Sequence, residues 1–330
     1  AAVGALVAFV AVAFGVPAAL ASGLFVAFWP SHAFYSSQIF KDPLVILGAT
    51  SALALASRMI ARPAASLPAL AGFFVLLIAT GLLRSYVMLA VSGSIALCAG
   101  WATLRRARGG RPWHSAALLL AVALATPAAF RPLARWVWTV ALPTTSGGEH
   151  PSDLTLVPAS VDIKTGAVVR PLSPQAIAEF RRFRQEADRI WARQADRTWA
   201  RHDDGREIST QLFYGERFES WLDVLLFMPR GAFYTLFMPL PGLYPIEGSV
   251  GRLLASVENS LLLLLAVLAA FGVRRLGVDA ARAVPLVFFL AMAGASSLLE
   301  VDLGSATRHR TLYFPMLLPF AIFWLPRPRP

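Results

Sequence analysis

Long apolar segments, separated by short polar stretches, follow one another along most of the chain. A helix needs about 20 mainly apolar residues to cross the hydrocarbon of a membrane, so these segments predict membrane-spanning helices. Pro17 and Gly23 divide the first segment into one span and a short interfacial helix. The predicted spans occupy residues 1–30, 43–56, 67–83, 86–104, 115–129, 261–273, 285–299 and 313–325. The pattern therefore predicts an all-α, polytopic bundle of about eight transmembrane helices.

One long polar region interrupts this pattern and divides the chain into three parts. Residues 1–142 form the N-terminal transmembrane part, residues 143–222 a loop region, and residues 223–330 the C-terminal part. Within the loop, Ser173 and Pro174 start a predicted amphipathic helix over residues 173–201, whose apolar positions recur every three or four residues. Its apolar stripe fits two arrangements, packing on the protein or lying in the lipid headgroup layer.

The segment 223–244 is apolar but contains several residues that break helices. Pro229, Gly231, Pro239, Pro241 and Gly242 all fall within it. Because a clean span carries few such residues, we predict a re-entrant or interfacial hairpin that does not cross the membrane.

Composition supports the membrane assignment and narrows the chemistry. The chain is 57% hydrophobic and 15% charged, well below the charge of about 25% in soluble proteins. The net charge of +11 fits cytoplasmic anchoring loops and lipid phosphates, and no segment resembles a nucleic-acid module. Cys98 is the only cysteine and the histidines show no metal-ligand spacing, so no metal or other cofactor is predicted. The chain begins without Met inside an apolar run, and we expect further sequence upstream.

The distribution of arginine predicts the orientation of the spans. Residues 105–111 contain four arginines and no acid, which places this loop in the cytoplasm by the positive-inside rule. Counting spans outward places the other basic loop ends, at 58–62, 274–282 and 327–329, on the same side. The opposite, extracytoplasmic side receives residues 41–42, Arg84, the long loop, Arg230, Glu258 and residues 300–310.

A candidate site follows from this sidedness. Residues 300–310 hold five ionisable side chains between two apolar segments, and charge so close to hydrocarbon is costly unless it pairs or binds a charged ligand. Carboxylates can accept a proton from an attacking hydroxyl, and arginines hold phosphate through paired hydrogen bonds. The predicted catalytic residues are Asp42, Glu300 and Asp302. The predicted phosphate-binding residues are Lys41, Arg84, Arg230, Arg308, His309 and Arg310.

Structural roles remain open for several of these residues. Arg84 can snorkel to the interface, and His309 can serve as an interfacial hydrogen-bonding residue. For Glu258 we expect a cap at the N-terminus of a helix, where an acid is favourable.

Two stretches resemble a known enzyme family. Residues 30–43, Pro-Ser-His-Ala-Phe-Tyr-Ser-Ser-Gln-Ile-Phe-Lys-Asp-Pro, are similar to the start of a span in glycosyltransferases of the GT-C superfamily. Residues 308–319, Arg-His-Arg-Thr-Leu-Tyr-Phe-Pro-Met-Leu-Leu-Pro, resemble a late span of these enzymes. Residues 227–231 and 238–241 also resemble bacterial membrane proteins of exopolysaccharide clusters. The resemblance, to the protein O-mannosyltransferase or exopolysaccharide type, covers most of the chain as a pattern.

The resemblance implies an enzyme of the bacterial inner membrane that takes a sugar from a polyprenyl-phosphate donor on the extracytoplasmic face. Asp42 matches the acidic end of the first motif, and Arg308 matches the arginine that would hold the lipid phosphate. Such enzymes usually carry their catalytic acid in a first outer loop, and no acidic residue precedes Asp42. The resemblance therefore implies either a segment upstream of residue 1 or a shared fold without the activity.

Other functions stay open beside this one. A polymerase or ligase acting on diphosphate-linked glycans would need the same arginines and depend less on a carboxylate. A transporter would need charges inside its spans, which are almost uncharged here. A non-catalytic membrane scaffold is also compatible with the sequence. The partners expected are a lipid-linked sugar donor and membrane lipids, without nucleic acid, and the oligomeric state is not predicted.

Overall fold

The computed structural model describes residues 2–37, 42–61, 66–136, 160–161, 168–169, 212–213, 220–243, 250–300 and 303–322. These residues are almost entirely helical, which confirms the all-α class. The exception is one antiparallel pair of two-residue strands, β1 (Ser160–Val161) and β2 (Val168–Val169). Most of residues 143–219 lie outside the described residues, and the predicted amphipathic helix 173–201 lies there entirely.

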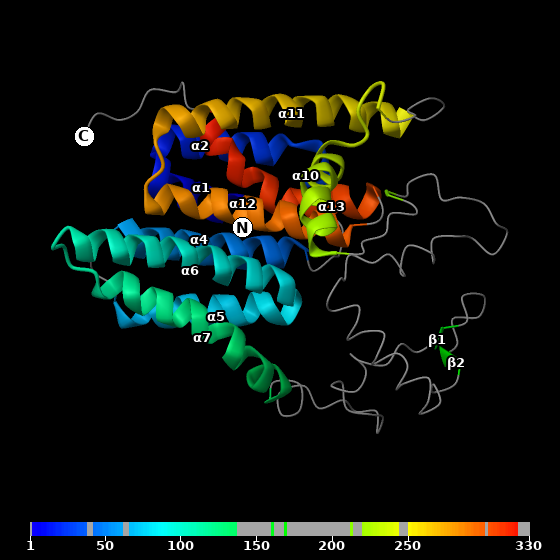
Figure 1. The fold of residues 1–330 in the computed structure, drawn as a ribbon. Coiled ribbons are helices and arrows are strands. Elements are labelled where there is room, and N and C mark those ends of the chain that lie inside the picture. Colours follow the sequence, from blue (N-terminus) through cyan, green and yellow to red (C-terminus); the bar gives the residue numbers. More distant parts are fainter. Residues whose placement is uncertain are drawn as a thin grey trace.

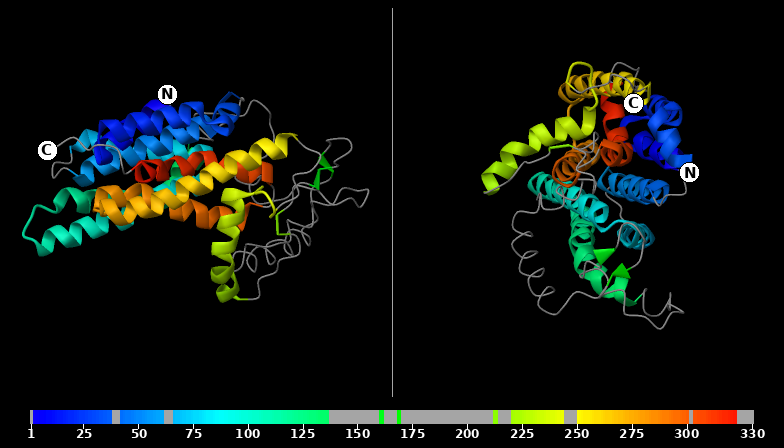
Figure 2. Two further views of the ribbon diagram at one scale, coloured as in Figure 1. Left: turned by 90° about the horizontal axis from the view of Figure 1, so that it is seen from above. Right: turned by 90° about the vertical axis from the view of Figure 1, so that its right-hand side faces the viewer.

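Within the described ranges, four helices are long and apolar enough to cross a membrane. They are α4 (Asp42–Ala61), α6 (Ser85–Arg108), α11 (Val250–Leu276) and α12 (Ala280–Leu299). They run along a common direction in Figures 1 and 2, and α5 (Leu67–Leu83) and α7 (His114–Trp136) lie beside α6. The bundle thus has the composition of a membrane protein, but the predicted count of eight spans is not confirmed.

The first apolar segment forms a helical hairpin. α1 (Ala2–Phe14) and α2 (Val16–Phe28) are joined by Gly15, whose φ of +91° favours glycine. Gly23 faces Val7 and Val3 so closely that a Cβ on Gly23 would collide with Val7. Each helix of 13 residues is about 20 Å long, shorter than a hydrocarbon core of about 30 Å. The structure therefore has two short helices with a break at Gly15, in place of the predicted span and short interfacial helix divided by Pro17 and Gly23, and α3 (Pro30–Ser37) follows them.

A single helix, α10 (Trp221–Phe237), replaces the first part of the predicted hairpin. Ser220 and Asp223 form a capping box at its start, and Pro229 removes one backbone hydrogen bond without ending the helix. The chain turns only at residues 241–243, before α11. Figures 1 and 2 show α10 lying across the direction of the long helices at one end of the bundle.

The last predicted span, residues 313–325, is not a continuous helix. α13 (Leu303–Tyr313) is followed by the 3₁₀ helix η3 (Phe314–Leu317) and by α14 (Leu318–Ala321). Pro315 and Pro319 lack the N–H groups that an unbroken α-helix would need here. All residues from 309 to 321 are buried, and Figure 1 shows this segment in the middle of the bundle. It is a central core element, not a lipid-facing span.

The helix directions place the charged clusters at two opposite ends. The start of α4, the junction of α5 with α6 and the end of α12 meet at what we call the site end, which holds Asp42, Arg84 and Glu300. The ends of α4 and α6 meet the start of α12 at the other end, which we call the basic end. Its described arginines are Arg58, Arg105, Arg106, Arg108, Arg111, Arg274, Arg275 and Arg282. This is the grouping that the sequence predicted for these residues.

Candidate functional site

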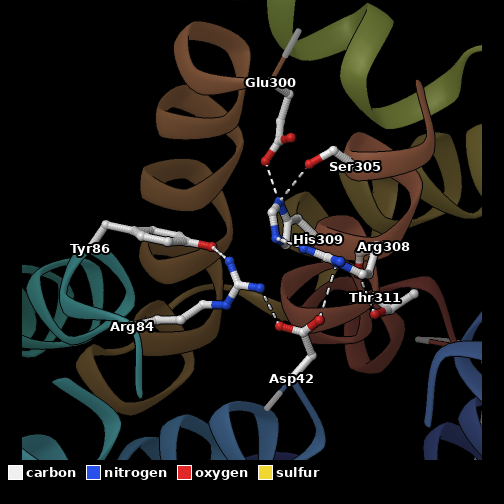
Figure 3. A network of polar contacts seen from close by, with 8 residues as sticks. All are labelled: Asp42, Arg84, Tyr86, Glu300, Ser305, Arg308, His309 and Thr311. Atoms are coloured by element: carbon white, nitrogen blue, oxygen red, sulfur yellow. Dashed lines mark hydrogen bonds and ion pairs between the residues drawn. The ribbon is translucent and has the colours of Figure 1, made fainter. Parts of the chain in front are cut away.

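Asp42 is the carboxylate around which the site end is arranged. It lies in the first turn of α4, where the helix dipole favours a negative charge, and it is 5% exposed. Arg84 Nη2 lies 2.5 Å from Asp42 Oδ1, and Arg308 Nε lies 3.2 Å from Asp42 Oδ2 (Figure 3). One buried carboxylate therefore holds two guanidinium groups, which leaves a local excess of positive charge.

Arg84 owes its position to a very short connection. It is the single residue between α5 and α6, with an extended backbone, and it caps the end of the first helix and the start of the second. Its backbone N–H donates to the carbonyl of Thr80. Its side chain also donates from Nη1 to the hydroxyl of Tyr86 at 2.9 Å, and the guanidinium stands 5.8 Å from the centre of that ring. Asp42 and Tyr86 together fix this guanidinium.

Three consecutive residues of α13 connect the site to different helices. Successive residues of a helix point about 100° apart, so Arg308, His309 and Arg310 face three directions. Arg308 reaches Asp42 of α4, and His309 reaches Glu300 at the end of α12. Arg310 donates to a backbone carbonyl near the end of α10. α13 thus makes polar contacts with α4, α10 and the end of α12 at the site end.

His309 and Glu300 form a buried carboxylate–imidazole pair. Nδ1 of His309 hydrogen-bonds Oε1 of Glu300, and the two residues are 9% and 7% exposed. Ser305 Oγ lies 3.4 Å from the same nitrogen, and Arg308 Nη2 lies 3.3 Å from the other ring nitrogen, Nε2. A carboxylate on Nδ1 favours the tautomer with the proton there, which leaves Nε2 as the acceptor. This is the arrangement of a general base oriented by a carboxylate.

Arg310 belongs to a second, deeper group. It is fully buried, donates to the Leu236 carbonyl at 2.9 Å and lies 3.9 Å from Glu258 Oε1. Glu258 also accepts a hydrogen bond from the indole nitrogen of Trp29. The expected helix-capping role of Glu258 is wrong, because α11 begins at Val250, two turns earlier. Glu258 is instead a half-buried partner that connects α11 with Trp29 and α13.

The structure brings most of the predicted site residues together. Asp42, Arg84, Glu300, Arg308 and His309 form one connected network, and Arg310 follows directly in the chain (Figure 3). Lys41 and Asp302, two of the predicted residues, lie outside the described residues.

Arg230, another predicted phosphate-binding residue, lies on the exposed side of α10. Its guanidinium is 5.9 Å from the ring centres of both Phe213 and Tyr234, which contact each other. An arginine beside aromatic rings is stabilised by cation–π contact, so its position also has a structural explanation.

Sequence reasoning missed three members of these networks. Tyr86 and Trp29 were read as parts of apolar segments, and Glu258 as a cap. Tyr86 is two residues from Arg84, which was a usable signal. Trp29 and Glu258 come from opposite halves of the chain, and nothing local relates them.

The arrangement can bind an anion and move a proton. Arginines in a poorly solvated site bind phosphate through short, charge-assisted hydrogen bonds. The Glu300–His309 pair beside Arg308 supplies a proton acceptor. Among the described residues, no group of three or more histidine, cysteine or acidic side chains could hold a metal ion.

The chain matches no protein-family model, no curated protein sequence and no solved structure. The function therefore has to be argued from the geometry of the site end and from the residues that the sequence placed there.

Proposed function

We propose that this chain is a membrane glycosyltransferase that transfers a sugar from a polyprenyl-phosphate donor to an acceptor at the site end. The observation that supports it most is the pair of arginines on Asp42, next to the Glu300–His309 pair, at one end of an apolar bundle. The concentration of arginine at the opposite end favours a bacterial inner-membrane protein with the site end facing the extracytoplasmic side.

Arg308 and Arg84 hold the donor phosphate in this proposal. The Arg308 side chain is 28% exposed and the Arg84 side chain 11%, so Arg308 meets the ligand first. Asp42, between them, keeps both guanidinium groups in place before the donor binds. Because Arg308 also contacts Nε2 of His309, a phosphate held by Arg308 lies within reach of that nitrogen.

His309 is the base of the transfer step in this proposal. The acceptor hydroxyl gives its proton to Nε2 as its oxygen bonds to the anomeric carbon of the sugar. The bond from that carbon to the phosphate oxygen breaks, and its electron pair leaves with the lipid phosphate, which the arginines stabilise. Glu300 positions the imidazole. Asp42 serves as the counter-ion of the two arginines, since each of its carboxylate oxygens already faces a guanidinium group.

An assay of membranes that contain the full chain tests this proposal. The donor is a radiolabelled sugar on polyprenyl phosphate, and sugar release is measured with a panel of sugars. We expect His309→Gln to lower the rate by about 10²- to 10⁴-fold, the usual contribution of a positioned base. Arg308→Lys should lower it by more than about tenfold, because lysine cannot form the paired hydrogen bonds of a guanidinium.

Arg108→Gln, at the basic end, is the matched control and should leave the rate unchanged. Protein amount and melting temperature are measured for each variant to separate activity from folding. Full activity of folded His309→Gln, or no release from any donor by the wild-type chain, would contradict the proposal.

A polymerase or ligase that uses diphosphate-linked glycans is the second candidate. It is favoured by the fact that Asp42 and Glu300 are already engaged by cations or by His309, while three arginines converge near α13. A pair of donors with the same glycan, one on a monophosphate and one on a diphosphate, separates the two. Activity with the diphosphate donor alone would establish the second candidate in place of the first.

A further inference from the structure

A cavity with a volume of about 580 Å³ opens at the basic end, between the ends of three long helices. Its walls come from the last residues of α4, the end of α6 with the turn after it, and the start of α12. The charged residues that line it are Arg105, Arg106, Arg111 and Asp279. It lies at the opposite end of the bundle from Asp42, so it is separate from the proposed active site.

Arg106 is a cavity-lining residue that also connects two helices. Its Nη2 donates to the carbonyl of Ile60 in the last turn of α4, which fixes the guanidinium between two helices. Its Nη1 is buried and has no hydrogen-bond partner among the described residues. A buried guanidinium without full hydrogen bonding is costly, and its positive charge favours an anion in the adjacent cavity.

The start of α12 adds to the positive potential of the cavity. Ala280 and Ala281, in the first turn of this helix, line the wall, where the helix dipole presents its positive end. Asp279 is the one carboxylate of the wall. Its Oδ1 accepts from the backbone N–H of Arg282 at 2.9 Å and its Oδ2 lies 3.7 Å from Arg282 Nε, so its charge is already engaged.

An exposed apolar strip lies on the face of α6 next to the face that lines the cavity. Leu97, Trp101 and Leu104 recur on one face of this helix, are 68%, 41% and 61% exposed, and end next to Arg105. Tryptophan is typical of the membrane–water interface. The strip and the arginines of the cavity lie on neighbouring faces of the same helix end, within the span of one phospholipid with its acyl chains and phosphate headgroup.

We infer that this cavity binds the phosphate headgroup of an anionic phospholipid. Arg105, Arg106 and Arg111 hold the phosphate, and the acyl chains lie on the exposed strip of α6. Basic pockets between membrane helices at the cytoplasmic side are a known setting for anionic lipids. Arg106 connects α6 to α4 at this point. The bound lipid would connect both of these helices to α12. The inference stands without the proposed transferase activity.

Thermal unfolding of the purified full chain in a neutral detergent tests the inference. The additions are a short-chain phosphatidylglycerol, the matching phosphatidylcholine and inorganic phosphate. A ligand that binds only the folded state raises the melting temperature as its concentration passes its Kd. We expect a rise with phosphatidylglycerol, none with phosphatidylcholine, and none with phosphate at the same concentration.

Two double variants assign the effect to the cavity. Arg105→Gln/Arg111→Gln removes two lining charges and should weaken phosphatidylglycerol binding about tenfold or more. Arg274→Gln/Arg275→Gln removes the same charge at the end of α11, outside the cavity wall, and should bind as the wild type does. Both keep Arg106, whose contact with Ile60 supports folding.

Three outcomes would overturn the inference. Equal weakening in both double variants would mean general surface charge, and an equal rise with phosphatidylcholine would mean that the headgroup charge is irrelevant. A rise with inorganic phosphate as large as that with phosphatidylglycerol would mean a soluble phosphate ligand and not a lipid.

Discussion

Asp42 and its two arginines are three charged side chains that lie within an apolar bundle. Two guanidinium groups and one carboxylate are partly or wholly removed from water, and each depends on the others for solvation. Such a group stabilises little relative to an apolar core, but removal of one member leaves the others uncompensated. The role of Asp42 can therefore be tested through stability as well as through activity.

Asp42→Asn should lower the free energy of unfolding by about 3 kcal/mol, because Arg84 and Arg308 lose their shared counter-charge without a change in side-chain shape. The measurement is reversible unfolding of the chain in detergent micelles. The double variant Asp42→Asn/Arg84→Gln should recover part of the loss, since one uncompensated cation is then gone. Strictly additive losses would show that the pair is not coupled.

His32 provides a pH-dependent contribution to stability. It lies in α3, outside the four candidate spans, is 5% exposed, and stacks on Trp29 with ring centres 6.4 Å apart. Its Nδ1 is buried without a hydrogen-bond partner among the described residues. Burial lowers the pKa of this imidazole below its ordinary value of 6.5, since the charged form loses its hydration.

The sign of the effect follows from this lowered pKa. The unfolded chain takes up a proton at His32 near pH 6.5, while the folded chain does so only at lower pH. The stability of the wild type relative to His32→Gln should be constant above about pH 7.5 and fall as the pH is lowered through 6.5. Melting temperatures of both proteins between pH 8 and 5 measure it, and parallel pH curves would contradict it.

At the scale of helices, α10 is held against α12 by a small residue. A Cβ at Gly231 would lie 2.9 Å from Ser297 Cβ and 3.0 Å from the Ser297 carbonyl oxygen, on the neighbouring helix. The close approach of these two backbones therefore requires glycine. Gly93, in the middle of α6, has no atom within 4 Å of such a position and serves as a matched control.

Gly231→Ala should lower the free energy of unfolding by about 1–3 kcal/mol, because α10 has to move away from α12. Gly93→Ala should leave it unchanged or raise it by up to about 1 kcal/mol, the usual gain of alanine over glycine in a helix. Melting curves of both variants in the same detergent measure the difference. A Gly231→Ala chain as stable as Gly93→Ala would mean that the helices do not pack this closely.

Helix bounds could be predicted where an apolar segment ends at a charge or a breaker on both sides. α5 matches residues 67–83 as predicted, because Pro68 starts it and Arg84 ends it. The predicted span of residues 261–273 is shorter than α11, because Glu258 and Asn259 indicated the start of the span, with Glu258 as its N-terminal cap. Their partners, Trp29 and the Pro239 carbonyl, lie far away in the sequence. A polar residue paired by a distant segment looks the same in the sequence as an unpaired one.

The site was predictable as a group but not as a set of pairs. Sidedness alone placed Asp42, Arg84, Glu300 and Arg308 at one end of the bundle, and the structure joins them. That Asp42 lies between two arginines, and that Glu300 contacts His309, depends on the rotation of α13 about its axis. The rotation of a helix is set by its packing against its neighbours. The sequence shows only an apolar segment with two prolines, and this does not indicate that residues 309–321 are buried in the centre of the bundle.

At the scale of the whole molecule, charge is divided between two ends that lie on opposite sides of an apolar layer. The basic end gathers arginines at the ends of α6 and α11, and the site end holds the network of paired carboxylates, arginines and His309. If this layer is a membrane, residues at the two ends face different compartments.

Single cysteines test this arrangement in a background with Cys98→Ala, which removes the one native cysteine. Arg108→Cys, at the basic end, should react with a membrane-impermeant maleimide only from the cytoplasmic side. Ser220→Cys, at the exposed start of α10, should react only from the other side. Intact cells and inverted vesicles give the two accessibilities, and labelling of both positions from one side would contradict the division.

The course of α13 through the centre of the bundle also bears on how the protein is made. Asp42 and Arg84 belong to helices that precede α13 in the chain, and they can pair with each other as soon as α6 begins. Arg308, His309 and Arg310 are synthesised later, and each then reaches a helix that precedes α13. These polar contacts therefore form only when α13, the helix that carries Arg308, His309 and Arg310, packs against the helices that precede it. A chain that stalls before α13 would leave Glu300 and Glu258 without His309 and Arg310, a state that membrane quality control can recognise.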